Sequence, residues 1–305
     1  ERQFGKGRVI WGKTPREVLL ADGVKPDFTF TGQEENPEQF DYIHRTSGDS
    51  EIYFVINRTN MTKSSNFTFR ISGKQPEIWN PVTGEMLKAN SFIQANGCTT
   101  LPLEFDQFGS NFIVFRKPIS NNESGKAKRN SLELSTILEL GDSWKVSFDP
   151  EWGGPGEVAF PKLTNWIDNL VDGIKYYSGK ATYRKSFNLI EVDKELKNGG
   201  IPEKRLFLDL GKVEDVAEVR LNGKKLGILW CPPWRVEITG TVKPSGNSLE
   251  IDVINLWANR VIGDLNLPKD KRFTKTHDGF RFDMIKGNTP LLDSGLLGPV
   301  RIMKE

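Results

Sequence analysis

Apolar and polar residues alternate in the last third of the chain, which predicts short β-strands joined by tight turns. Residues 217–221 alternate apolar and charged side chains, the period-two pattern of a half-buried strand. Asn222 and Gly223 follow, and this pair supplies the positive φ angles of a hairpin turn. After a second turn at 243–247, residues 249–253 alternate again. We expect an antiparallel sheet with one buried face.

Strand-like segments recur across the second half of the chain. They are predicted at residues 144–148, 181–189, 205–210, 216–221, 234–238, 248–255 and 298–303. One or two short helices are expected near residues 163–168. Residues 264–294 are expected to form a long irregular segment, and loops of that length often carry function.

An all-β unit is also predicted in the first half. Strand-like segments recur there at intervals of roughly ten residues without a helical period, a spacing typical of a β-sandwich. They are residues 42–45, 51–57, 67–71, 76–79, 101–105 and 110–115. The small β-sandwich is therefore placed at residues 37–118.

Residues 1–36 are expected to be a strand and helix connector. Thr14 is a plausible N-cap, with Pro15 at the first helical position and Glu17 in the first turn, and Gly23 ends the short helix. The chain opens in mid-pattern at Glu1, so we expect a connector from a larger upstream domain.

A second boundary is expected between the two β-rich regions. Residues 119–131 are polar and have no apolar anchor after the first residue, which is typical of a linker. The second domain would then comprise residues 132–305.

Composition suits a folded chain and excludes some partners. The 305 residues are 37% hydrophobic, with a mean hydropathy of −0.46, and no apolar run approaches the ~18 residues of a membrane span. The 42 basic and 40 acidic residues are spread along the chain. We therefore expect neither a nucleic-acid partner nor a membrane partner.

Reactive side chains give no catalytic or metal motif. Cys98 and Cys231 are expected to be free thiols, although their pairing stays open, and His44 and His277 are too far apart to suggest a zinc site. Nucleophile-elbow, phosphate-loop and dinucleotide patterns are absent. No spacing singles out a carboxylate pair for glycoside hydrolysis, so no catalytic residue is assigned.

Four motifs of the second domain carry a family resemblance. They are residues 144–155, the Tyr-Ser-Gly-x-Ala-x-Tyr run at 177–183, residues 255–264 and residues 294–300. In combination they resemble the sugar-binding jelly-roll module of glycoside hydrolases of families 2 and 106. Residues 41–45, 53–55 and 76–79 resemble the β-sandwich that precedes this module in α-L-rhamnosidase-like proteins.

The resemblance implies a fold, partners and a location. The fold class would be all-β, with two β-sandwich domains, the second a galactose-binding-like jelly roll, after a short strand and helix connector. The partners would be carbohydrate and an upstream catalytic domain that holds the paired glutamates. A structural calcium ion is possible, although no Asp-rich ligand loop is visible. The parent protein would be bacterial, and periplasmic or secreted.

Candidate sugar-binding residues follow from the chemistry of sugar recognition, in which aromatic faces stack on sugars and planar polar side chains hold hydroxyls. Such residues cluster in the second domain: Trp230, Trp234 and Arg235 beside a Pro-Pro turn, Trp257, Asn259, Arg260 and Asp264 in one run, and His277 in the irregular segment. A structural alternative stays open, with Trp257 in the core and a buried ion pair between Arg260 and Asp264.

Three functions remain open at this point. The chain could be a non-catalytic accessory region that binds carbohydrate or buttresses the catalytic barrel. Its loops could instead complete the active site of a full-length glycosidase. It could also be a purely structural pair of domains, because jelly rolls host many roles.

Overall fold

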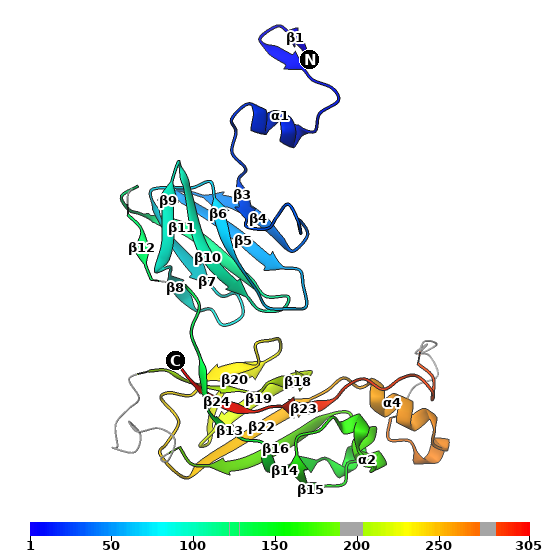
Figure 1. The fold of residues 1–305 in the computed structure, drawn as a ribbon. Coiled ribbons are helices and arrows are strands. Elements are labelled where there is room, and N and C mark those ends of the chain that lie inside the picture. Colours follow the sequence, from blue (N-terminus) through cyan, green and yellow to red (C-terminus); the bar gives the residue numbers. More distant parts are fainter. Residues whose placement is uncertain (122, 128, 190–203, 275–284) are drawn as a thin grey trace. The chain divides into compact units, whose positions relative to one another are not determined.

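A computed structural model describes residues 1–121, 123–127, 129–189, 204–274 and 285–305. The chain divides into two compact units, residues 1–131 and 132–305, and antiparallel strands dominate both (Figure 1). The predicted all-β class is therefore confirmed. None of the helices in these ranges is long and apolar enough to cross a membrane.

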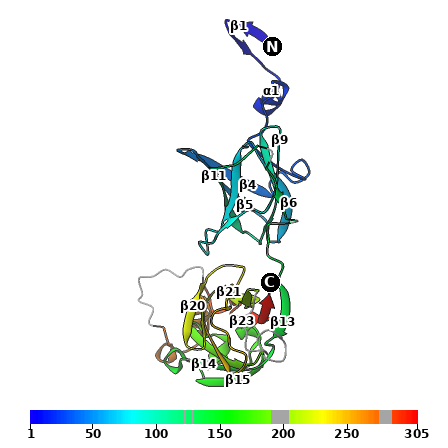
Figure 2. The ribbon, with the colours of Figure 1, turned by 90° about the vertical axis from the view of Figure 1, so that its left-hand side faces the viewer.

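The first unit is a β-sandwich preceded by a hairpin and a helix. One sheet has the strand order β12-β9-β10-β6-β3 and the other β4-β5-β11-β7-β8, and Figure 2 shows β5 and β6 in the two separate layers. Its elements are β1 (Arg2–Phe4), β2 (Gly7–Val9), α1 (Pro15–Ala21), β3 (Phe28–Phe30), β4 (Phe40–Ser47), β5 (Ser50–Asn57), β6 (Lys63–Phe69), β7 (Lys74–Trp79), β8 (Met86–Lys88), β9 (Ser91–Ala95), β10 (Cys98–Phe105), β11 (Ser110–Pro118) and β12 (Gly125–Lys126). Aromatic rings fill the core, where the Phe28 ring contacts those of Phe67 and Phe69.

Helix α1 begins as its sequence predicts. The Thr14 hydroxyl accepts from the Glu17 backbone N–H, and the Glu17 carboxylate accepts from the Thr14 backbone N–H at 2.6 Å. This capping box satisfies two N–H groups that the first turn leaves without helical partners. The helix ends at Ala21 and the following Gly23 has φ +78°, a conformation that glycine adopts without strain.

The ends of the first unit differ from the predicted boundaries. Strand β3 lies inside the predicted connector and pairs with β6, so the sandwich starts at Phe28. Strand β12 lies inside the predicted linker and pairs with β9. The Asn130 amide also donates to the carbonyls of Ser91 and Pro102. Polar composition suggested a linker, but these pairings attach Gly125, Lys126 and Asn130 to the sandwich.

The second unit is built on a six-stranded sheet, β15-β14-β16-β22-β19-β20, and a four-stranded sheet, β13-β24-β17-β21. Strands β18 and β23 form a short separate ladder. The elements are β13 (Ser135–Glu139), β14 (Asp142–Phe148), η1 (Pro150–Trp152), β15 (Glu157–Lys162), η2 (Trp166–Asp168), α2 (Asp172–Lys175), β16 (Lys180–Phe187), β17 (Leu206–Asp209), β18 (Lys212–Glu214), β19 (Val216–Leu221), β20 (Lys224–Leu229), β21 (Arg235–Glu237), β22 (Asn247–Ile254), α4 (Ala258–Leu265), η3 (Lys269–Lys271), β23 (Gly295–Gly298) and β24 (Arg301–Lys304).

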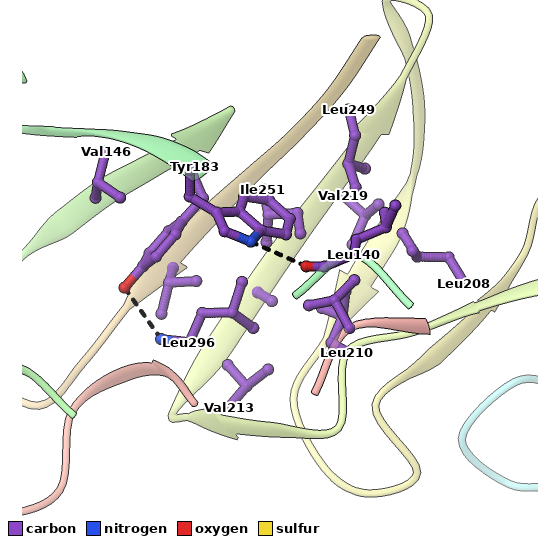
Figure 3. Packing of buried hydrophobic residues seen from close by; sticks show 14 of the residues in the cluster. Leu140, Val146, Tyr183, Leu208, Leu210, Val213, Val219, Leu249, Ile251 and Leu296 are labelled. Atoms are coloured by element: carbon purple, nitrogen blue, oxygen red, sulfur yellow. Dashed lines mark hydrogen bonds between the residues drawn. The ribbon is translucent and has the colours of Figure 1, made fainter. Parts of the chain in front are cut away.

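Alternation along the strands builds the core of this unit. Leu249, Ile251 and Val219 point into one cluster (Figure 3). Arg220 and Glu250 alternate with them along β19 and β22 and form an ion pair. The predicted strands are all present within a few residues. Helix α4 was not predicted: it is only eight residues long, and its buried residues include the polar Asn259, Arg260 and Asp264.

A buried hydroxyl joins three distant segments of this core. The Trp166 indole N–H donates to the Tyr183 hydroxyl at 2.6 Å, and the Leu296 backbone N–H donates to the same oxygen at 3.2 Å. Figure 3 shows Tyr183 directed at Leu296. Burial raises the pKa of Tyr183 to about 12, so the phenol stays protonated at neutral pH.

Replacing Tyr183 with Phe should destabilise the second unit by about 1–3 kcal/mol, because two buried N–H donors lose their acceptor while the ring is kept. Chemical denaturation measures the change. Tyr176→Phe is the matched control, since the Tyr176 hydroxyl makes no hydrogen bond to the described residues. Equal stability of the two variants would contradict this role for Tyr183.

Candidate functional site

One end of the six-stranded sheet gathers the connections that carry most of the candidate residues. The register places Lys180, Ile254 and Val216 in one row across three strands, and Phe148 and Leu229 lie at the same end of β14 and β20. Helices α2 and α4 lie at this end in Figure 1. We call it the loop end, formed by residues 149–156, 172–179, 211–215, 230–234, 255–274 and 292–294.

Three exposed tryptophans lie at the loop end. Trp152, Trp257 and Trp230 are 48%, 52% and 60% exposed. They follow β14, β22 and β20, and each of these strands is separated from the next by a single strand. Because neighbouring strands lie ~4.8 Å apart, the ends of these three strands lie roughly 10 Å apart along this edge. The other three tryptophans of the unit are Trp144, Trp166 and Trp234, and all are buried.

Two of the predicted candidates beside the Pro-Pro turn have structural roles. Trp234 is only 8% exposed and belongs to the core, so it is not presented on a loop. The Arg235 guanidinium donates to the Asp209 carboxylate at 2.8 and 2.9 Å. Arg235 opens strand β21, whose register with β17 directs the two side chains together.

Asn259 is also structural. It is buried in α4, where its amide donates to the Leu292 carbonyl at 2.7 Å and to the Ser294 hydroxyl at 3.0 Å. Its carbonyl oxygen accepts from the Leu292 backbone N–H at 2.8 Å. These bonds fasten residues 292–294 to the helix and leave the amide directed away from solvent.

Arg260 and Asp264 form the buried ion pair that was the structural alternative. The Arg260 Nε lies 3.0 Å from Asp264 Oδ1, close enough for an ion pair although the atoms are not aligned for a hydrogen bond. The Thr274 hydroxyl and backbone N–H donate to Asp264 Oδ2 at 2.6 and 2.7 Å. The guanidinium lies 4.8 Å from the Phe273 ring centroid. His277 lies outside the described residues.

A buried polar network holds the residues on either side of Trp257. The Asn255 amide donates to the Tyr177 carbonyl and the Ser294 hydroxyl, and its oxygen accepts from the Gly179 N–H. The Ser178 hydroxyl donates to the Leu256 carbonyl at 2.9 Å. In the sequence these residues stand out only as parts of motifs, because nothing local in the sequence reveals which polar groups form hydrogen bonds with one another.

The loop end also carries charged groups. Lys212 lies 3.0 Å from Glu214 and 2.9 Å from Asp293, and the Asn165 amide donates to Asp293. The Lys212 ammonium, followed by that amide, holds the pKa of Asp293 below its usual range. Asp215 accepts from the Leu256 N–H at 3.0 Å. Aromatic faces, carboxylates and amides are the kinds of group that sugar sites use.

The residues that the structure describes give little support for metal or thiol chemistry. Among the residues that the structure describes, no three His, Cys, Asp or Glu side chains are placed to hold a metal ion. Cys98 and Cys231 are free thiols, and burial raises the pKa of Cys231.

Comparison with known proteins assigns a family resemblance. Residues 1–93 match the family model of the alpha-L-rhamnosidases of glycoside hydrolase family 106. A solved rhamnosidase from Novosphingobium sp. PP1Y superposes on 95% of the chain with a TM-score of 0.82 and 34% identity. The chain is similar to family 106 alpha-L-rhamnosidases. The predicted resemblance is thus confirmed.

The chain spans only part of the length of these relatives. It covers 26% of the Novosphingobium rhamnosidase. A second relative, named as a putative beta-glucuronidase of Formosa agariphila, is 37% identical over 203 residues, which are 59% of this chain and 17% of that protein. The relatives are therefore much longer glycoside hydrolases.

Breaking the buried ion pair between Arg260 and Asp264 should lower the stability of the second unit. Arg260→Met should destabilise the second unit by about 3–5 kcal/mol, because it leaves the Asp264 charge buried without its cation. Trp257→Ala is the comparison, and as a half-exposed position it should cost far less. Denaturant unfolding measures both, and a smaller loss for Arg260→Met than for Trp257→Ala would contradict the structural role.

Proposed function

We propose that this chain is a non-catalytic accessory region of a glycoside hydrolase, and that the loop end of its second unit contacts carbohydrate. The observation that carries this proposal is the placement of three exposed tryptophans in connections at one end of a single sheet. The resemblance to a rhamnosidase over 95% of the chain supports the carbohydrate class. The second unit would then act as a galactose-binding-like jelly roll.

Exposed indole rings are unfavourable in water and favourable in contact with a sugar face. A large apolar ring held in water is unfavourable, and gathered apolar surface on a folded unit marks a contact site. Indole faces are well suited to the C–H-rich faces of sugars, while carboxylate and amide oxygens accept from hydroxyls. The loop end offers both, with Trp257 as the central ring and Asp293 and Asn165 as polar partners.

A second candidate function rests on a separate observation. Leu256 and Leu292 are also exposed at the loop end, and the relatives are roughly three and a half to four times as long as this chain. The loop end could therefore complete the active site of the parent glycosidase or pack against its catalytic domain. We assign no catalytic residue to this chain in either case, and we propose that the parent is periplasmic or secreted, where polysaccharides are met.

Proton NMR with rhamnose- and galactose-containing oligosaccharides tests the first candidate. We expect selective broadening of ligand signals and intact sugars over time. Trp257→Ala and Trp230→Ala should each weaken binding about five- to thirtyfold, which corresponds to a loss of about 1–2 kcal/mol of stacking and burial.

Trp11→Ala is the matched control, because Trp11 is exposed in the first unit and should not contribute. Equal weakening by all three variants would contradict a site at the loop end. Absence of any broadening would favour the second candidate, and new anomeric signals would show that the chain itself hydrolyses glycosides.

A further inference from the structure

A row of apolar side chains crosses all five strands of the first-unit sheet β4-β5-β11-β7-β8. The register places its members directly opposite one another from strand to strand: Ile43, Phe54, Phe112, Trp79 and Met86. Ile43 and Met86, at the two ends of the row, are 55% and 62% exposed. The next residues along the central strands, Tyr53 and Ile113, belong to the sandwich core. The row therefore lies on the face of the sheet that points away from the core.

A shallow hollow of about 270 Å³ lies on this face, between β4, β5 and β11. Ile43, Ile52, Phe54 and Phe112 line it together with Arg45. The Phe54 and Phe112 ring centroids are 4.8 Å apart. We call this surface the apolar face, formed by the five residues of the row and Ile52.

The sequence of the two central strands is that of strands covered on both sides. Residues 52–56 of β5 and 112–115 of β11 are consecutive apolar residues, whereas a strand with one face in water alternates. Strand β6 of the other sheet does alternate. Its outward residues Ser64, Asn66 and Thr68 are polar, between Phe67, Phe69 and their neighbours. The outward face of one sheet thus suits water, and that of the other suits a covering surface.

The size of the apolar face indicates what kind of surface covers it. Five strands at ~4.8 Å spacing and five residues along β5 give a footprint of roughly 300 Å². A stable interface between separate chains buries about 800 Å² on each partner, so the face is too small to hold a second copy or a free protein. A domain of the same polypeptide needs less area, because the covalent link keeps its local concentration high.

The connector that precedes the sandwich also lacks a covering surface. Residues 1–24 include no buried residue, and Phe4 and Trp11 are 78% and 64% exposed. A seven-residue helix and a hairpin of three-residue strands are marginal in water by themselves. The solved rhamnosidase that superposes on 95% of this chain is itself matched over only 26% of its length. About three quarters of such a protein is therefore available to cover these surfaces.

We propose that the apolar face is a docking surface for another domain of the same polypeptide, in the larger part of the parent glycoside hydrolase. The matching surface would be apolar, with a carboxylate at its rim for Arg45, which forms no ion pair with the described residues. This inference rests on the proposed place of the chain in a longer enzyme, and it does not depend on which role the loop end has.

A carbohydrate suits the apolar face less well than a protein surface does. The Phe54 and Phe112 rings are tilted by 46° to one another, so they form no flat platform for sugar rings. Sugar sites also need planar polar groups for hydroxyls. Glu77, which lies on the same face, is already paired with Arg116 and accepts from the Trp79 indole.

Thiol labelling tests whether the face is covered. Met86→Cys and Ile43→Cys place a thiol at each exposed end of the row, in a background that carries Cys98→Ser and Cys231→Ser. We expect a maleimide to react with both in the 305-residue chain. In the full-length parent the reaction should be at least about tenfold slower, because a docked face admits the reagent only when the contact opens.

Ile93→Cys is the matched control, because Ile93 is 65% exposed on β9 of the other sheet and should react equally fast in both proteins. A second variant tests the contact itself. Ile43→Asp in the parent should speed the labelling of Met86→Cys about five- to tenfold, because it places an unpaired charge in an apolar contact. Ile93→Asp makes the same change outside the face and should leave that rate unchanged.

Three results would overturn the proposal. Equal labelling rates in the chain and the parent would show that the face is open to water. Protection already in the isolated chain, with a dimer mass in sedimentation, would assign the face to a second copy. Protection that requires added oligosaccharide would make it a sugar surface. All three are read without reference to sugar binding at the loop end, so failure here is distinct from failure of the proposed function.

Discussion

The hydrogen bonds of a few buried polar side chains hold the loop end of the second unit in shape. Asn255 and Asn259 converge on Ser294, and Ser178 connects the end of β22 to the start of α4. Each of these groups would be costly to bury alone, and each is paired. Because the network joins segments that are far apart in sequence, it sets where Trp257 sits, and the proposed recognition of carbohydrate depends on that position.

The sequence predicted the strands well and the roles of single side chains less well. Period-two alternation at 217–221 and 249–253 depends on neighbours along the chain, so it could be read directly, as could the Thr14 capping box. Trp230 and Trp234 occupy similar local contexts, yet one is exposed and the other is in the core. Only the pairing of β21 with β17 separates them, and that pairing is not local.

Helix α4 is a second case in which the sequence did not reveal the roles of single side chains. Asn259, Arg260 and Asp264 look like the planar polar groups of a sugar site, but their partners are the Leu292 backbone, Phe273 and Thr274.

The most direct test of the account is a titration of the ¹⁵N-labelled chain with a binding oligosaccharide, read at the tryptophan indole N–H signals. The account predicts saturable shifts for Trp152, Trp230 and Trp257 and unchanged signals for the buried Trp144, Trp166 and Trp234. Binding that leaves the three exposed indoles unmoved would contradict the central claim that the loop end is the carbohydrate-contacting surface.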